Sequence, residues 1–268
     1  VLARGDLFPD ALAGGPLAAH VKGPLLITSP SALDAATKAE IQRVAPAGST
    51  VYLLGGTAAL SPSIDAAVKA AGYTTVRVSG PNRFATAVAI AQALGNPGVV
   101  FEATGTNFPD ALSGGPAAIV KGAAILLTNG KTQAPETAAY LAAHAGATRY
   151  ALGGPAAAAD THATALVGAD RFATSAAVAS MFFPAPTDFG LSTAIDFPDA
   201  LSAGPDLAAK SAPLLLVSPA TPLSGAYVTY VYAVGHGVTA GHVYGGAVAI
   251  HDDVVVEMQN ALFAAGAV

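Results

Sequence analysis

The chain contains no cysteine and no tryptophan, and its charged residues are few. Without cysteine it forms neither disulfides nor thiolate metal sites. Its 12 Lys and Arg residues stand against 17 Asp and Glu residues, which gives a net charge of −5 without any basic cluster. Because binding to phosphate backbones needs clustered basic side chains, nucleic acid is not an expected partner.

Long hydrophobic runs are also missing, although the composition is unusually apolar. Of the 268 residues, 53% are hydrophobic and only 11% are charged. No stretch of about 18 residues continues without Gly, Pro or a polar break, so we expect no membrane span. Much of the apolar surplus is alanine, which suits helices packed closely on sheets and units that bury faces against one another.

What the chain does contain is one five-residue motif that occurs three times, together with two further motifs that recur with a similar period. Phe-Pro-Asp-Ala-Leu starts at Phe8, Phe108 and Phe197, at spacings of 100 and 89 residues. Each copy precedes an apolar run that ends in a glycine pair, at 55–56, 153–154 and 245–246. The segment 80–86 returns as 168–174. The sequence therefore predicts one structural unit of about 90 residues used three times. Triplication suits a multivalent binding surface better than a single catalytic pocket.

Within each unit, short apolar strands alternate with alanine-rich helices. The second unit predicts strands over 99–104, 124–128 and 148–152, and helices over 108–120 and 135–144. This alternation indicates βαβ units, and hence an α/β fold of three tandem Rossmann-like subdomains with parallel sheets.

The expected domains are residues 1–76, 77–166 and 167–268. The first has no counterpart of segment 80–86, so we expect it to be an N-terminally incomplete unit. Gly154 and Arg171 are only 17 residues apart, whereas Gly56 and Arg83 are 27 apart. A helix or strand between the second and third units must therefore be shortened.

The repeated aspartates are the first candidate site residues: Asp10, Asp110 and Asp199. One interpretation is a capping box, in which Asn107 caps the helix and Asp110 reaches back to it while the Phe packs in the core. The other is that these aspartates line a crevice at the carboxyl edge of each sheet, where open α/β sheets bind ligands. Asn107 is a candidate ligand residue as well.

Two repeated arginines, Arg83 and Arg171, are the second candidates. Asn82 and Asp170 are predicted N-caps, so each arginine lies in a first helical turn, where a cation opposes the helix dipole. A charge in such a position needs a partner. Pairing within one unit would join Arg83 to Asp110 and Arg171 to Asp199 by bidentate salt bridges, and direct ligand contact is the alternative.

Thr86 and Thr174 lie one helical turn after these arginines and are within reach of the same cluster. Signatures of catalysis or of a cofactor are missing from the sequence. The six histidines show no metal-binding spacing, and the glycine pairs match neither nucleotide-binding fingerprint. We therefore expect no cofactor, no metal and no enzyme activity.

Together these motifs resemble the type 2 cell wall binding repeat family of Gram-positive surface proteins. The resemblance covers nearly the whole chain. In the second unit the matching residues are Arg77, Gly80, Asn82, Arg83, Phe84, Thr86, Ala87, Gly105, Asn107, Phe108–Leu112, Pro116, Ala118, Leu126–Thr128, Gly153 and Gly154. The first unit lacks the Arg-Phe-x-Thr element, which leaves Asp10 without an arginine unless Arg4 or upstream residues supply one. Ala165 stands in the position of Arg77 before the third unit.

The resemblance implies three subdomains around a pseudo-threefold axis. It also implies a secreted protein at the cell surface, anchored non-covalently to an anionic wall polysaccharide or teichoic-type polymer. Arg83, Arg171, Asp10, Asp110, Asp199, Thr86, Thr174 and Asn107 would form the binding sites. The alternatives are a structural subunit that self-associates in a surface layer or filament and, with less support, a wall hydrolase.

Overall fold

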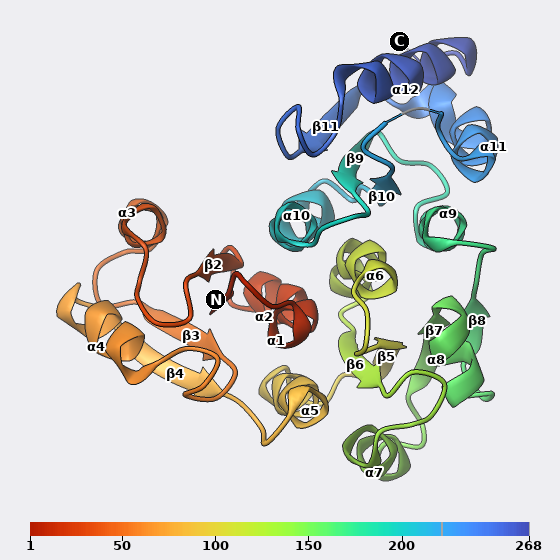
Figure 1. Cartoon of the computed structure of the whole chain (residues 1–268). Coiled ribbons are helices and arrows are strands. Elements are labelled where there is room, and N and C mark those ends of the chain that lie inside the picture. Colours follow the sequence, from red (N-terminus) through yellow and green to blue (C-terminus); the bar gives the residue numbers. More distant parts are fainter. Residues whose placement is uncertain (221, 268) are drawn as a thin grey trace.

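The computed structural model describes residues 1–220 and 222–267 and divides them into three α/β units around a common centre (Figure 1). Each unit has its own sheet, and all pairings between the named strands are parallel. Parallel strands of this kind are covered by helices on both faces, which explains their continuous apolar sequences. The predicted fold of three Rossmann-like subdomains is confirmed.

The first unit has the strand order β2-β1-β3-β4. Its strands are β1 (Leu2–Arg4), β2 (Leu26–Thr28), β3 (Thr50–Leu54) and β4 (Thr74–Val78). Helices α3 (Ala35–Val44) and α4 (Pro62–Ala70) pack on the outer face, and α1 (Pro9–Leu12) and α2 (Gly14–His20) lie towards the centre (Figure 1). Because β4 extends to Val78, Arg77 belongs to the first sheet although the expected second domain starts there.

The second unit has the order β6-β5-β7-β8. Its elements are β5 (Val99–Thr104), α6 (Pro109–Val120), β6 (Ala124–Thr128), α7 (Pro135–Ala143), β7 (Thr148–Leu152), α8 (Gly153–Ala159) and β8 (Thr164–Leu166). The expected shortening is confirmed. Helix α8 has 7 residues and β8 has 3, against 9 in α4 and 5 in β4. Since α8 starts at the glycine pair itself, the intervening loop is also gone.

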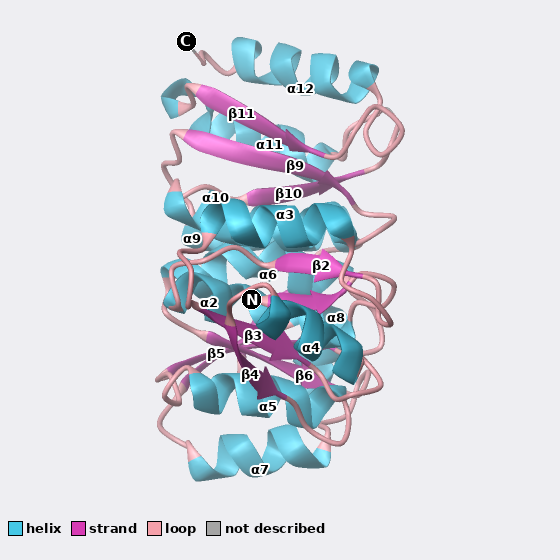
Figure 2. Ribbon diagram, turned by 90° about the vertical axis from the view of Figure 1, so that its left-hand side faces the viewer, coloured by secondary structure: helices cyan, strands magenta, loops and turns pink. Residues whose placement is uncertain are grey.

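The third unit has only three strands among the described residues, in the order β10-β9-β11. Its elements are β9 (Asp188–Thr193), α10 (Pro198–Ala209), β10 (Leu214–Val217), α11 (Gly225–Val234), the 3-10 helix η1 (Gly235–Gly237), β11 (Ala240–Tyr244) and α12 (Asp252–Ala264). Helix α12 lies beyond β11 at one end of the molecule (Figure 2).

Two helices link consecutive units: α5 (Arg83–Ala93) and α9 (Arg171–Phe182). Both predicted N-caps are confirmed, because Asn82 Oδ1 accepts from Ala85 N at 2.9 Å and Asp170 Oδ1 accepts from Ala173 N at 2.8 Å. Helix α5 packs against α1 and α2 of the first unit and β6 of the second. Helix α9 packs in the same way against α6 and β10. Each linking helix therefore fills a junction between two units.

The pseudo-threefold centre is formed by α2, α6 and α10, which contact one another. Their glycine and alanine residues allow close approach. A methyl group on Gly204 would lie 4.0 Å from the carbonyl carbon of Gly115. The phenylalanines that precede α1, α6 and α10 also meet at the centre. The rings of Phe8, Phe108 and Phe197 form a triangle with centroids 5.6, 5.8 and 5.8 Å apart. One phenylalanine from each repeat thus marks the axis.

Candidate functional site

The three Phe-Pro-Asp turns lie at equivalent places in the units. Each follows the carboxyl end of a strand, β1, β5 or β9, and begins a helix, α1, α6 or α10. The carboxylates of Asp10, Asp110 and Asp199 are half-buried there. This edge is where open α/β sheets bind ligands.

The predicted capping box is not present. The N-cap positions are occupied by Phe8, Phe108 and Phe197, and none of the three helices has a side-chain cap. Asn107 is one residue too early, so its Oδ1 accepts only from Phe108 N, at 2.9 Å. Asp110 is the second helical residue, not the third. The aspartates are therefore not used as caps.

Instead, each aspartate packs on the first glycine of its unit's glycine pair. A methyl group added to Gly55 would lie 2.3 Å from Asp10 Oδ2, and one added to Gly153 would lie 1.9 Å from Asp110 Oδ2. At Gly245 the distance to Asp199 Oδ2 is 2.8 Å. The three glycines also have positive φ, at 89°, 80° and 121°. Glycine is required there because the backbone turns and a carboxylate occupies the space of a Cβ.

The predicted salt bridges within units, Arg83 with Asp110 and Arg171 with Asp199, are wrong. Neither arginine forms a direct ion pair with any described carboxylate. The charge of Arg83 acts on Asp10, and that of Arg171 acts on Asp110. The reason is the packing of the linking helices, which place their first turns against the preceding unit. Each arginine therefore serves a junction rather than its own unit.

Each arginine is fixed by one hydrogen bond to the unit that follows. Arg83 Nη1 donates to Gly105 O at 2.5 Å, and Arg171 Nη1 donates to Ala194 O at 2.6 Å. The guanidinium of Arg83 also lies 5.8 Å from the ring centroid of Phe8, within cation–π distance. Among the described residues neither guanidinium makes a second hydrogen bond. Since the group carries five N–H donors, most of them are left for water or a ligand.

Burial and these cations act against each other at the aspartates. Burial raises the pKa of Asp10, while the Thr86 hydroxyl and the charges of Arg4 and Arg83 oppose that increase. Burial raises the pKa of Asp110 to about 6, opposed only by the charge of Arg171. Arg4 thus supplies a cation near Asp10, although its bidentate partner is Asp6, with both N–O distances at 2.7 Å.

The two threonines are inside the protein, with 2% of Thr86 and 3% of Thr174 exposed. Their hydroxyls accept from Gly80 N at 3.2 Å and from Gly168 N at 3.1 Å. They hold the turn that precedes each linking helix, and the Thr86 hydroxyl also acts on Asp10. Asn107, in contrast, is exposed.

Arg77 shows what a purely structural arginine looks like in this chain. Its guanidinium donates to three backbone carbonyls, Gly55 O at 2.8 Å, Gly56 O at 3.1 Å and Leu60 O at 2.9 Å. These bonds fix the loop after the first glycine pair. In the second unit that loop is absent, which explains why Ala165 suffices at the equivalent position.

Sequence reasoning missed a buried polar cluster in the second unit. Glu102 is fully buried in β5 and accepts a hydrogen bond from Gln133 Nε2, while its Oε1 has no partner among the described residues. Burial raises the pKa of Glu102 to about 7, and the neighbouring Asp160 carboxyl raises it further. Asp160 is itself paired with Arg149 Nη1 at 3.1 Å. The equivalent residues in the other units are Leu2 and Leu191, so no repeated motif marks this cluster.

In the part of the chain that the structure describes, no cluster of three or more His, Cys, Asp or Glu residues is placed to hold a metal ion. No described helix combines the length and the apolar character needed to cross a membrane.

Comparison with known proteins identifies the repeats. The family described as Cell wall binding domain 2 (CWB2) matches residues 1–65, 77–163 and 165–255. The three matching segments confirm the three tandem repeats that the motifs predicted.

Two similar proteins come from Bacillus subtilis (strain 168). The amidase enhancer is 34% identical over 128 residues, which are 48% of this chain and 18% of that protein. N-acetylmuramoyl-L-alanine amidase LytC is 26% identical over 224 residues, which are 81% of this chain and 45% of that protein. The chain thus spans less than half the length of these relatives.

Two solved structures from Clostridium difficile share the fold. Cwp8 matches with a TM-score of 0.86 at 24% identity, over 98% of this chain and 47% of that one. Cwp6 matches with a TM-score of 0.85, also at 24% identity, over 97% of this chain and 43% of that one. The pseudo-threefold arrangement of three α/β units is therefore common to the three proteins.

Proposed function

Because this chain belongs to the cell wall binding domain 2 family, we propose that it anchors a secreted protein non-covalently to an anionic polymer of a Gram-positive cell wall. The polymer would be a wall polysaccharide or teichoic-type chain bearing phosphate or carboxylate groups. The binding sites are the junctions between units, where Arg83 and Arg171 lie. The protein would act at the cell surface as a binding module, and any enzyme activity would belong to other domains.

The observation that carries this proposal is the unused hydrogen-bonding capacity of two equivalent arginines. Arg83 and Arg171 are half-buried, each donates a single hydrogen bond from Nη1, and neither is neutralised by a direct ion pair among the described residues. Arg77 donates three bonds and has no such capacity. A planar guanidinium held in this way suits bidentate bonding to phosphate or carboxylate.

Repetition would convert weak contacts into firm attachment. One acidic group at one arginine gives a modest affinity, but a polymer that engages both junctions binds the second site intramolecularly. Asp10 and Asp110 would limit each site by partly neutralising the cation and by accepting bonds from polymer hydroxyls. Asn107 would add an exposed amide from the loop that precedes α6.

Cosedimentation with purified Gram-positive cell walls tests the proposal. We expect Arg83→Ala and Arg171→Ala each to weaken binding about tenfold, because a charge-assisted bidentate contact contributes on the order of 1.5–3 kcal/mol. The double variant should bind intact walls only as strongly as the unaltered protein binds walls stripped of their secondary polymers. Raising the salt concentration should weaken the unaltered protein, since partly exposed charges are screened.

Arg43→Ala is the matched control, because Arg43 is an exposed arginine of α3 paired only with Glu40. It should bind at the level of the unaltered protein. Circular dichroism and thermal unfolding must show that the double variant is folded. A folded double variant that still binds walls at native strength would rule out the arginine sites.

A further inference from the structure

Two exposed aliphatic side chains lie in the loops that precede the Phe-Pro-Asp helices. Leu7 is 48% exposed in the loop before α1, and Ile195 is 62% exposed in the loop before α10. Both loops follow the carboxyl end of a strand, β1 or β9, which is the sheet edge that carries the arginine sites. Single exposed apolar residues are common on protein surfaces, so exposure alone does not assign them a role.

The fold does not require an aliphatic residue at the position of Leu7. Counted from the Phe-Pro-Asp motif, the equivalent residues are Asn107 and Asp196. Asn107 Oδ1 accepts from Phe108 N at 2.9 Å. In the same way, Asp196 Oδ1 accepts from Phe197 N at 2.8 Å. Leucine has no side-chain acceptor, so Leu7 leaves out a hydrogen bond that the other two units make.

Ile195 likewise occupies a position that is polar in the other units. Its equivalents are Asp6 and Thr106, and each bonds to a side chain two residues earlier. Asp6 accepts two hydrogen bonds from Arg4. The hydroxyl oxygen of Thr106 lies 2.8 Å from that of Thr104. Isoleucine has no polar side-chain atom, so both aliphatic residues replace side chains that bond locally in the equivalent loops, which indicates a role other than folding.

Each aliphatic residue adjoins one arginine site. Leu7 directly precedes the first motif phenylalanine, and the ring centroid of that phenylalanine lies 5.8 Å from the Arg83 guanidinium. Ile195 directly follows Ala194, whose carbonyl oxygen accepts from Arg171 Nη1 at 2.6 Å. A polymer segment that bonds to either guanidinium therefore passes an exposed aliphatic side chain.

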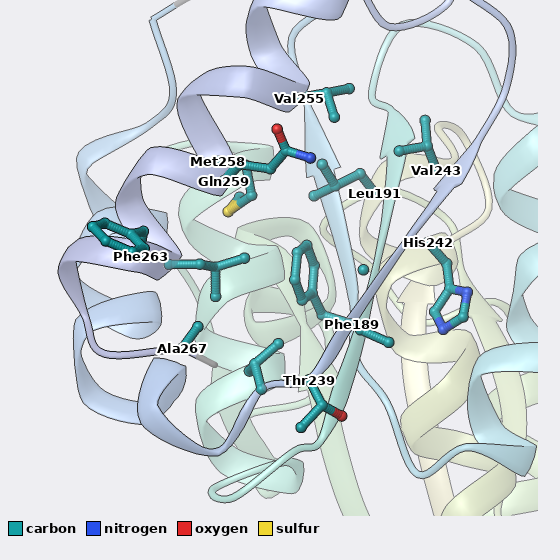
Figure 3. Close-up of a pocket in the computed structure, with 14 residues that line it drawn as sticks. Phe189, Leu191, Thr239, His242, Val243, Val255, Met258, Gln259, Phe263 and Ala267 are labelled. Carbon is teal, nitrogen blue, oxygen red and sulfur yellow. The ribbon is translucent and has the colours of Figure 1, made fainter.

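A second group of exposed apolar side chains does not adjoin an arginine site. Val243 and Phe263 are 43% and 83% exposed, and both line an apolar cavity of about 340 Å³ between β9, β11 and α12 (Figure 3). The described residues that line this cavity include no arginine, and α12 lies at one end of the molecule (Figure 2). The cavity therefore provides exposed apolar surface for comparison with Leu7 and Ile195.

We propose that Leu7 and Ile195 select a polymer built of sugar rings. Each side chain packs on the C–H face of a pyranose ring, while Arg83 or Arg171 holds the phosphate or carboxylate next to that ring. This inference rests on the proposed function and narrows its ligand to an acidic wall polysaccharide. A linear polyol phosphate carries similar anionic groups, but it has no ring with a broad C–H face. The aliphatic contacts therefore favour the polysaccharide, because they remove apolar surface of both partners from water.

Two substitutions that copy the second unit test this proposal: Leu7→Asn, after Asn107, and Ile195→Thr, after Thr106. Isothermal titration calorimetry measures binding to two purified polymers, a phosphate-bearing hexose polysaccharide and poly(glycerol phosphate). We expect each variant to bind the polysaccharide about threefold to tenfold more weakly, because the contact with the ring loses buried apolar surface. Both variants should bind poly(glycerol phosphate) as the unaltered protein does.

Phe263→Asn is the matched control, because it removes an exposed apolar side chain that does not adjoin an arginine site. It should bind both polymers at native strength. Thermal unfolding should show that Leu7→Asn and Ile195→Thr are at least as stable as the unaltered protein, since each introduces the residue that bonds locally in the second unit.

The proposal is wrong if the folded variants Leu7→Asn and Ile195→Thr bind the polysaccharide at native strength, or if they lose affinity for both polymers equally. It is also wrong if the unaltered protein binds only poly(glycerol phosphate). Arg83→Ala and Arg171→Ala separate this failure from failure of the proposed function. If the arginine variants weaken binding and the aliphatic variants do not, the anion sites stand without the sugar contact. If none of the four variants weakens binding, the proposed function fails as well.

Discussion

The three junctions around the pseudo-threefold axis are not equivalent. The first junction joins units one and two and contains α5, and the second joins units two and three and contains α9. At the third junction, α10 of the third unit meets α2 of the first, and no linking helix lies there among residues 1–220 and 222–267 (Figure 1). Within the described part of the chain, Asp199 accordingly has no counterpart of Arg83 or Arg171 across from it.

The central helices differ in the same way. Counting from the Phe-Pro-Asp motif, Ser113 of α6 corresponds to Ser202 of α10, and Ala117 corresponds to Asp206. Ser113 and Ala117 are 2% and 0% exposed, while Ser202 and Asp206 are exposed. Asp206 pairs with Lys210 and accepts a hydrogen bond from Tyr244 Oη at 2.5 Å. The sequence of α10 is therefore suited to water at the face that the other units bury.

The largest effect should come from placing the aspartate of α10 at the equivalent buried position of α6, where a linking helix fills the junction. Ala117→Asp would bury a carboxylate without a partner between packed helices, so we expect unfolding free energy to fall by about 3 kcal/mol or more. Chemical denaturation followed by circular dichroism measures it. Val120→Asp is the control, because Val120 is on the same helix and 42% exposed. Equal losses in the two variants would mean that burial at the junction is not the cause.

Glu102 should make the stability of the second unit, and of the junction that follows it, depend on pH. The first junction has no such group, because the equivalent residue in the first unit is Leu2. Its folded-state pKa of about 7 is above the ordinary value of 4.5, so folding favours the neutral carboxyl. This contribution is complete below about pH 4.5 and is lost as the pH rises through 7. We expect a loss of roughly 2–3 kcal/mol across this range, and Glu102→Gln should remove it.

The location of that loss can be measured as well. Asp160 precedes β8, and β8 leads into α9, so hydrogen exchange in α9 should accelerate at high pH after correction for the intrinsic rate. The amides of α5 serve as the internal control. Equal acceleration in both helices, or an unchanged pH dependence in Glu102→Gln, would contradict this account. Glu102→Leu, which copies Leu2 and Leu191, gives a second variant without the ionisable group.

The repeats made most of the fold predictable from sequence. Equivalent motifs fixed the strands and helices of each unit, and the spacing between Gly154 and Arg171 correctly indicated a shortened segment. The N-caps at Asn82 and Asp170 were also predictable, because capping depends on a few neighbouring residues.

The pairing of charges could not be predicted in the same way. Assigning Arg83 to Asp110 assumed that one repeat is one closed unit, but α5 packs on the preceding unit and directs Arg83 towards Asp10. Such a choice depends on contacts between repeats, which no local pattern records. The Glu102 cluster was not predicted for a related reason, because it occurs only once and Glu102 replaces a core leucine. Repetition shows what units share, and unique residues show where they differ.

Binding provides a smaller and more selective test of the junctions. The pKa of Asp110 is about 6, so protonation below that pH removes a negative charge beside Arg171. We expect wall binding to strengthen about threefold between pH 7.5 and 5.5, within the range of a weak exposed charge interaction. At both pH values, Asp110→Asn should bind walls as strongly as the unaltered protein does at pH 5.5. Asp199→Asn, at the junction without a linking helix, should bind walls as the unaltered protein does at each pH. An equal gain in both variants would mean that the two junctions do not differ in binding.

The smallest effect belongs to the exposed face of α10. Asp206→Ala removes an ion pair with Lys210 that is partly exposed, so we expect a loss of only about 0.3–1 kcal/mol, measured by chemical denaturation. Lys210→Ala is the matched variant and should lose less, because Asp206 then keeps its hydrogen bond from Tyr244 Oη. A loss as large as that of Ala117→Asp would mean that this face is covered in solution. Because cover by a second copy depends on concentration, repeating the measurement at several protein concentrations would identify it.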